Sequence, residues 1–192
     1  MSSPVQPLVL LDVDGVLNAV QAWGRSDAWP DWCTGSATAD GRSFPITWSP
    51  SVVAAVRSWR ELAEVQWLTT WGHDANTSLR HLLELPDLPV AGTYDDVDGP
   101  AGDRDADGPA HASVAPAAPD RLTGRWWKFD VVRRIVHTGG SRRIVWLDDD
   151  LAGQDDVRAW MRQHTSSLLV APDPRSGLTP AQLRAVEAFL RA

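Results

Sequence analysis

The sequence LVLLDVDGVLN, residues 8–18, is the segment that says most about the architecture of this chain. Residues 8–11 form a short apolar run without helical spacing, which is typical of a strand covered on both faces in a parallel sheet. Asp12 and Asp14 follow, and then Gly15, which permits a turn that a residue with a Cβ would resist. Acidic side chains at the end of a buried strand are costly unless they meet a cation, so the segment predicts a metal site. The alternative is an ordinary Asp-Gly hairpin turn.

Length and composition indicate a soluble globular protein. The chain has 192 residues, of which 43% are hydrophobic and 22% charged, so we predict a single domain over residues 1–192. Its formal net charge of −7 argues against a general nucleic-acid or anionic-membrane binder, although a local basic pocket stays open. The one cysteine, Cys33, indicates a reducing compartment, and no apolar stretch approaches the roughly 18 residues that span a bilayer. We therefore expect a cytoplasmic protein without a membrane partner.

Two segments lack the periodicity of regular elements. Residues 19–47 carry Gly, Pro, Ser, Thr and Trp, and they predict a Trp-rich flap built from loops, with a hairpin as one option. Residues 95–120 are rich in Asp, Ala, Gly and Pro, so they cannot bury enough apolar area to offset their ordering entropy. We expect a mobile acidic surface loop there. Neither segment predicts a large cap domain.

The rest of the chain alternates between strand and helix patterns. Strands are expected at 8–11, 65–68, 88–91, 143–147 and 167–171, and helices at 49–63, 74–85, 124–137, 155–163 and 179–190. Such alternation favours a mostly parallel sheet with helices on both faces, because right-handed crossovers leave few other connections. The predicted fold class is therefore α/β, a three-layer Rossmann-like architecture.

Polar side chains gather at the predicted strand ends. Thr69 and Thr70 follow one strand, the acidic triplet 148–150 follows another, and Lys128 lies in the first turn of a helix. Because ligands of such sheets bind beyond the carboxyl ends of the strands, we expect these groups to lie near Asp12 and Asp14. Carboxylates, a hydroxyl and an ammonium group together suit a site for Mg²⁺ and a phosphate.

The order of these pieces resembles the haloacid dehalogenase (HAD) superfamily. LDVDGV at residues 11–16 looks like its first motif, WLT at 67–69 like its second, Lys128 like its third, and VWLDD at 145–149 like its fourth. More narrowly, the chain is similar to the HAD domains associated with actinobacterial RNA repair proteins. The resemblance implies a HAD fold and a phosphatase that hydrolyses a phosphomonoester of a small molecule, a nucleotide or a nucleic-acid end.

The resemblance also implies a role for each acid. Asp12 would attack phosphorus and become an aspartyl phosphate, and Asp14 would protonate the leaving oxygen and then deprotonate water. Mg²⁺ would be held by Asp12, by the main-chain carbonyl of Asp14 and by Asp149, with Asp148 as the nearest substitute. The superfamily's further acid has no clear match, because position 153 is glycine and the next candidates are Asp155 and Asp156.

The other implied residues each have an alternative. Thr69 would bind the phosphoryl oxygens, but a one-residue shift at the strand end would exchange it with Thr70. Lys128 would neutralise the nucleophile and the phosphate, unless it lies on the solvated face of its helix. Trp71 and the pair 126–127 either line the mouth of the site, where they could stack on a base or sugar, or pack in the core. For the whole protein, the alternative is a non-hydrolytic adaptor that binds phosphate or a nucleic-acid end.

Overall fold

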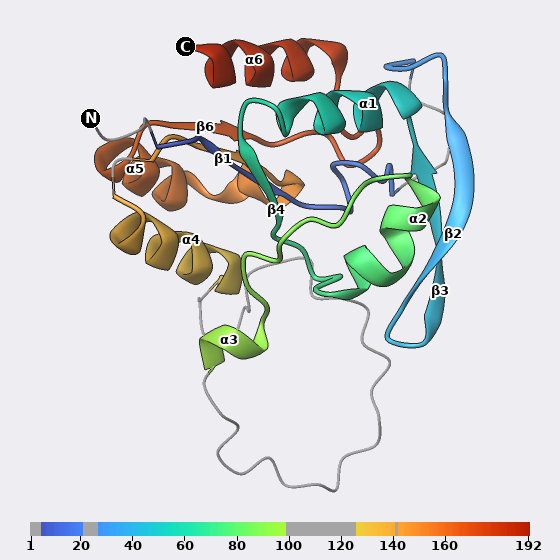
Figure 1. The fold of residues 1–192 in the computed structure, drawn as a ribbon, viewed down its shortest axis with the longest axis horizontal. Coiled ribbons are helices and arrows are strands. Elements are labelled where there is room, and N and C mark those ends of the chain that lie inside the picture. The colour runs from blue at the N-terminus through green and yellow to red at the C-terminus, as the bar shows by residue number, and fades with distance from the viewer. Residues whose placement is uncertain (1–4, 21–26, 99–125, 141) are drawn as a thin grey trace, which may run out of the picture.

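Four parallel strands form the central sheet. The fold is that of a computed structural model, which describes residues 5–20, 27–98, 126–140 and 142–192 (Figure 1). In spatial order the strands are β4 (Glu64–Trp67), β1 (Leu8–Leu11), β5 (Ile144–Leu147) and β6 (Ser167–Val170). The two central strands, β1 and β5, are buried along their whole length, as their continuous apolar runs predicted. The hairpin alternative at Asp14 and Gly15 is wrong, because β1 pairs in parallel on both sides.

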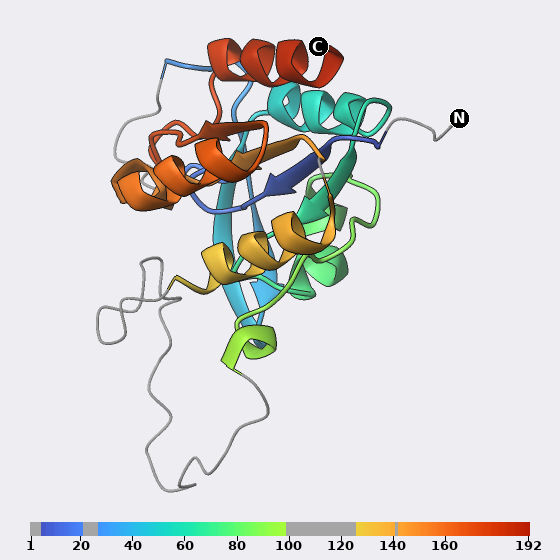
Figure 2. The same ribbon diagram turned by 90° about the vertical axis from the view of Figure 1, so that its left-hand side faces the viewer.

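Helices cover both faces of this sheet (Figures 1 and 2). On one face α1 (Pro50–Trp59) and α6 (Pro180–Arg191) pack in the cluster that contains Val9 and Leu11. On the other face α4 (Trp127–Thr138) and α5 (Asp155–His164) pack in the cluster that contains Leu8 and Leu10. The alternation of side chains along β1 thus supplies both interfaces. The predicted three-layer α/β fold is confirmed.

Two of these helices begin at the caps that the sequence predicted. The Ser49 hydroxyl accepts a hydrogen bond from the Val52 N–H at 3.4 Å, and a proline follows Ser49 at the first helical position. Thr179 and Gln182 form a reciprocal capping box at the start of α6.

The predicted helix at residues 74–85 differs in type and length. Ala75–Leu79 is a π-helical segment, followed by α2 (Arg80–Leu82). The Asn76 amide explains the wide turn, because it accepts from the Trp67 indole at 2.9 Å and donates to the Leu88 carbonyl at 2.7 Å. The Arg80 Nε donates to the Asn76 carbonyl at 2.7 Å and satisfies an acceptor that an α-helix would have used.

The expected strand at residues 88–91 is reduced to a single parallel bridge between Trp67 and Val90. The Trp67 N–H donates to the Pro89 carbonyl, and the Ala91 N–H donates to the Trp67 carbonyl. Pro89 has no N–H with which to extend the ladder. The segment therefore lies along the outer edge of β4 without forming a strand.

The Trp-rich flap contains a hairpin. β2 (Cys33–Ala39) pairs antiparallel with β3 (Arg42–Trp48), and the two strands meet at Asp40 and Gly41, whose φ angles are +50° and +69°. Two positive φ values define the type I′ turn that suits a two-residue hairpin, and Asp-Gly is its preferred sequence. Residues 21–26 of the predicted flap lie outside the described part of the chain.

The start of the predicted acidic loop forms a helical turn. Asp95–Asp98 forms a helical turn, α3, in which the Asp96 carboxylate accepts hydrogen bonds from the N–H and the hydroxyl of Thr93. The Asp96 side chain thus caps the turn, and the expectation of a mobile loop over residues 95–120 stays a prediction. Residues 99–120 lie outside the described residues. Assignment of the whole chain to one domain and to the cytoplasm stays a prediction. Within the described residues, no helix combines the length and the apolarity needed to cross a bilayer.

Candidate active site

The sheet register brings two acids side by side. Leu11 pairs with Leu147 on the neighbouring strand, and Asp12 and Asp148 are the next residue on each chain segment. Side chains alternate along a strand, so residues 12 and 148 continue the row of Leu10 and of Trp146, which packs toward α4. Both carboxylates therefore point toward the first turn of α4.

A buried lysine on that turn joins the two carboxylates. The Lys128 Nζ donates to Asp12 Oδ2 at 2.6 Å and to Asp148 Oδ2 at 2.8 Å. Lys128 is only 2% exposed, so the alternative of a solvated position is wrong. A charge at this depth is stable only when it is paired. The sequence contains a further signal for this position. Lys128 is the only lysine in the chain, and the other residues in the count of Lys and Arg are all arginines.

The charges of this group determine its protonation. Burial opposes the ammonium form of Lys128, but the carboxylates of Asp12 and Asp148 outweigh burial and raise the pKa of Lys128 above its ordinary value. Lys128 therefore stays charged. Burial raises the pKa of Asp148, and the charge of Lys128 opposes that rise.

Asp149 completes a cluster of carboxylates. One oxygen from each of Asp12, Asp148 and Asp149 lies within 4.8 Å of the other two. Burial and the charges of Asp12 and Asp150 raise the pKa of Asp149 to about 6. Three carboxylates with one ammonium group leave a net negative charge, and an all-oxygen donor set suits Mg²⁺. The residues present therefore fit Mg²⁺, the metal expected from the sequence.

Gly15 makes room for Asp149. Its φ is +71°, and a Cβ built at this position would lie 2.3 Å from the Asp149 Cγ. Any side chain at residue 15 would thus displace the Asp149 carboxylate. Gly15, from the first predicted motif, thereby allows Asp149, from the fourth predicted motif, to approach the loop after β1.

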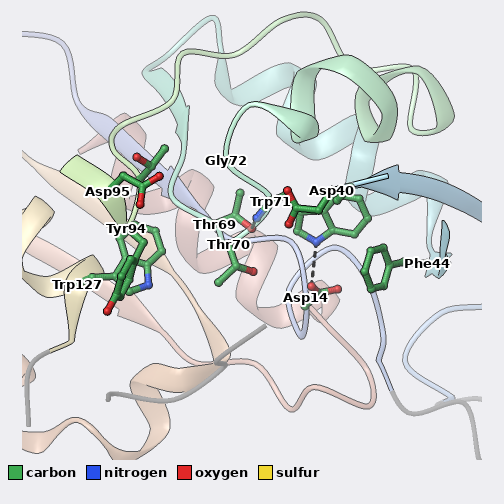
Figure 3. Close-up of a pocket in the computed structure, with 12 residues that line it drawn as sticks. Asp14, Asp40, Phe44, Thr69, Thr70, Trp71, Gly72, Tyr94, Asp95 and Trp127 are labelled. Carbon is green, nitrogen blue, oxygen red and sulfur yellow. Dashed lines mark hydrogen bonds between the residues drawn. The ribbon is translucent and has the colours of Figure 1, made fainter. Parts of the chain in front are cut away.

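Asp14 lies in different surroundings from Asp12. Its Oδ1 accepts from the Asn18 Nδ2 at 2.7 Å, and its Oδ2 accepts from the Trp71 Nε1 at 2.9 Å (Figure 3). Burial raises the pKa of Asp14, while these two hydrogen bonds lower it in part. The net shift is upward. The two acids of this motif therefore have different partners. Asp12 is paired with a cation, and Asp14 accepts hydrogen bonds from neutral donors.

The β2–β3 hairpin supports both donors to Asp14. The Thr47 N–H on β3 donates to the Asn18 Oδ1 at 2.8 Å, which fixes the amide so that its Nδ2 faces Asp14. The Phe44 ring packs edge-on against Trp71, with 5.6 Å between ring centroids. Sequence reasoning assigned Asn18 no role and left Trp71 between lining and core packing. The structure places Trp71 on a cavity wall and against Asp14.

The two threonines after β4 differ in exposure. Thr69 is 1% exposed and Thr70 is exposed, and both line the same cavity as Asp14. The Thr69 Oγ1 accepts from the Trp71 N–H at 3.3 Å, so its own hydroxyl proton stays available for donation.

The remaining sequence candidates are placed as follows. Asp155 and Asp156 begin α5 as exposed residues and do not belong to the carboxylate cluster. Trp126 stacks on the buried Trp146 at 4.9 Å, which is core packing. Trp127 lines the cavity beside Asp14.

Comparison with known proteins adds one match. A family model described as the HAD domain in Swiss Army Knife RNA repair proteins matches residues 8–183, a range that contains every site residue described above. Neither a curated protein nor a solved structure matches the chain.

Proposed function

This chain belongs to the HAD domains of Swiss Army Knife RNA repair proteins, as its motifs predicted, and we propose that it is a Mg²⁺-dependent phosphatase acting through an aspartyl phosphate. One observation carries the proposal: Asp12 is hydrogen-bonded to the ammonium group of Lys128, whereas Asp14 is held by Asn18 and Trp71. The mechanism needs one ionised carboxylate and one that can hold a proton. The surroundings of the two acids meet that need.

Asp12 is the nucleophile. One of its carboxylate oxygens forms a bond to phosphorus while the bond from phosphorus to the leaving oxygen breaks. Asp14 donates its proton to that leaving oxygen, so the product alcohol departs neutral. Lys128 balances the negative charge of Asp12 and of the phosphoryl group, and the free hydroxyl proton of Thr69 is donated to a phosphoryl oxygen.

Asp14 then serves as the base. It takes a proton from water, whose oxygen attacks phosphorus and releases the carboxylate of Asp12 and inorganic phosphate. Asp14 ends this step protonated, ready for the next leaving group. A raised pKa favours the acid role, and the hydrogen bonds from Asn18 and Trp71 to the ionised form favour the base role.

Asp12, Asp149 and the main-chain carbonyl of Asp14 would hold Mg²⁺, which when bound screens the charge between the nucleophile and the phosphate. Both oxygens of Asp148 are already engaged, one by Lys128 and one by the Asp150 N–H at 3.1 Å. Asp148 is also fully buried whereas Asp149 is only partly buried, and this difference in access favours Asp149 over Asp148 as the ligand. Asp148 then acts by holding Lys128 in place.

The substrate that we propose is the phosphomonoester of a nucleotide or of a nucleic-acid end. The description of the family, which places these domains in RNA repair proteins, supports this class. The net charge of −7 argues against general binding along a nucleic-acid chain.

The test is phosphate release from a panel of phosphomonoesters that includes nucleotides and 5′- and 3′-phosphorylated oligonucleotides, with and without Mg²⁺. Wild type with Mg²⁺ should release phosphate, Asp12→Asn should not, and the exposed control Asp155→Asn should match wild type. Equal release by Asp12→Asn would overturn the proposal. Mg²⁺-dependent binding of a phosphorylated ligand without any release would favour the adaptor instead.

A further inference from the structure

A cavity of about 450 Å³ opens beside Asp14 (Figure 3). Asp14 and Thr69 line it, whereas the metal-cluster acids Asp12, Asp148 and Asp149 are not among the described residues that do so. Its size lies within the range of small-molecule sites. The cavity therefore lies next to Asp14, the proposed general acid, and not next to the metal cluster.

We infer that this cavity binds the leaving group, and that the leaving group is an uncharged nucleoside whose base lies among the aromatic side chains. The assignment rests on the proposed function, because it takes Asp14 as the acid that protonates the leaving oxygen. A group next to that acid is, by this geometry, the part of the substrate that departs.

Aromatic rings form opposite walls of the cavity. Phe44 and Trp71 lie on one side and Tyr94 and Trp127 on the other, with Thr70 between them in Figure 3. Phe44 is 37% exposed and Tyr94 is 42% exposed, so part of each ring is accessible to a ligand in the cavity. Such rings offer faces for a planar group, and a base has a π-face whatever its identity.

Carboxylates complete the lining. Asp40, at the hairpin turn, and Asp95, at the start of α3, join Asp14 at the cavity. Ionised carboxylates accept hydrogen bonds and repel anions. A nucleoside provides sugar hydroxyl and amino donors for them, whereas the phenyl ring of a phosphotyrosine provides none. A second phosphate on the leaving group would be repelled by the carboxylates of Asp40 and Asp95.

The test compares kcat/KM for AMP, ribose 5-phosphate, ADP and phosphotyrosine with Mg²⁺. AMP should exceed ribose 5-phosphate by about tenfold or more, as expected for base stacking, and should exceed ADP as well. Phe44→Ala and Tyr94→Ala, on opposite walls, should each lower the ratio of AMP to ribose 5-phosphate. The control is Phe189→Ala on α6. It removes a ring that packs against Arg143, and it should leave the ratio of AMP to ribose 5-phosphate unchanged. Asp40→Asn combined with Asp95→Asn should narrow the preference for AMP over ADP.

A wild-type ratio near one, or a ratio that neither wall variant changes, would overturn the inference, and so would a preference for phosphotyrosine over AMP. Calorimetric binding of adenosine and of ribose to Asp12→Asn separates this inference from the proposed function. If no phosphate ester is hydrolysed, the proposed phosphatase function is wrong. Adenosine binding that Phe44→Ala weakens would still support the cavity assignment, and absent or unchanged binding would reject it.

Discussion

The indole Nε1 of Trp71 donates a hydrogen bond of 2.9 Å to the carboxylate of Asp14, a residue 57 positions earlier in the chain. This contact joins the end of β4 to the loop after β1. An indole N–H is a donor only, so it favours the ionised form of the acid. Trp71 therefore lowers the pKa of a carboxyl group that burial raises, and it also fixes the direction in which that group points.

Trp71→Phe should shift the pH profile of catalysis. Loss of a donor to the ionised form raises the pKa of Asp14 further, so Asp14 stays protonated to higher pH. Because protonated Asp14 is required for the first step, the alkaline limb of kcat/KM against pH should move to higher pH. We expect kcat to fall roughly tenfold, which corresponds to one hydrogen bond to a charged group. Trp160→Phe, at a partly buried tryptophan on α5, is the matched control and should keep the wild-type profile.

The sequence was sufficient to predict the four parallel strands of the sheet and the gathering of Asp12, Asp148 and Lys128 at one edge, but not the absence of a strand at residues 88–91. β1 and β5 are continuous apolar runs because both their faces are buried, and the acids that follow them meet because parallel strands end at one edge. Asn18 and Trp71 were not predicted as partners of Asp14. Their positions depend on where the β2–β3 hairpin packs, which is a tertiary contact that local patterns do not encode. The Asp-Gly pair at residues 40–41 was a local signal for the hairpin turn that we did not use.

Lys128→Met should destabilise the protein strongly. The substitution leaves Asp12 and Asp148 buried without their cation, a change that costs about 3 to 5 kcal/mol in other buried ion pairs. Urea unfolding at pH 7.5 without metal measures the loss. Arg133→Met removes a half-exposed cation on the same helix, whose pair with Asp130 spans 3.6 Å, and should cost about 1 kcal/mol or less. Equal losses for the two variants would contradict a buried charge network at Lys128.

Mg²⁺ affinity should fall in acid. Asp149 has a pKa of about 6 in the metal-free protein, and a divalent cation binds its ionised form. Below pH 6 each unit should weaken binding up to about tenfold, because a proton must leave first. Calorimetric titration with Mg²⁺ at pH 5, 6 and 7.5 tests this dependence. Asp149→Asn should lose most of the affinity at pH 7.5, whereas the exposed Asp155→Asn should retain both the affinity and the pH dependence. Affinity that is constant from pH 5 to 7.5 would contradict this dependence, and full affinity in Asp149→Asn would exclude Asp149 as a ligand.

Two glycines with nearly the same positive φ allow the cost of the backbone conformation to be separated from the effect on the metal site. Gly15 has φ +71° beside Asp149, and Gly41 has φ +69° with nothing within 4 Å of a built Cβ. Alanine at either position incurs the left-handed conformational cost of about 1 to 2 kcal/mol. Only Gly15→Ala also drives its Cβ into the Asp149 carboxylate, so only this variant should lose Mg²⁺ affinity and activity. Thermal unfolding of both variants, together with Mg²⁺ titration, measures the two effects. If Gly15→Ala and Gly41→Ala bound Mg²⁺ equally well, Asp149 would not need its present position to hold the metal.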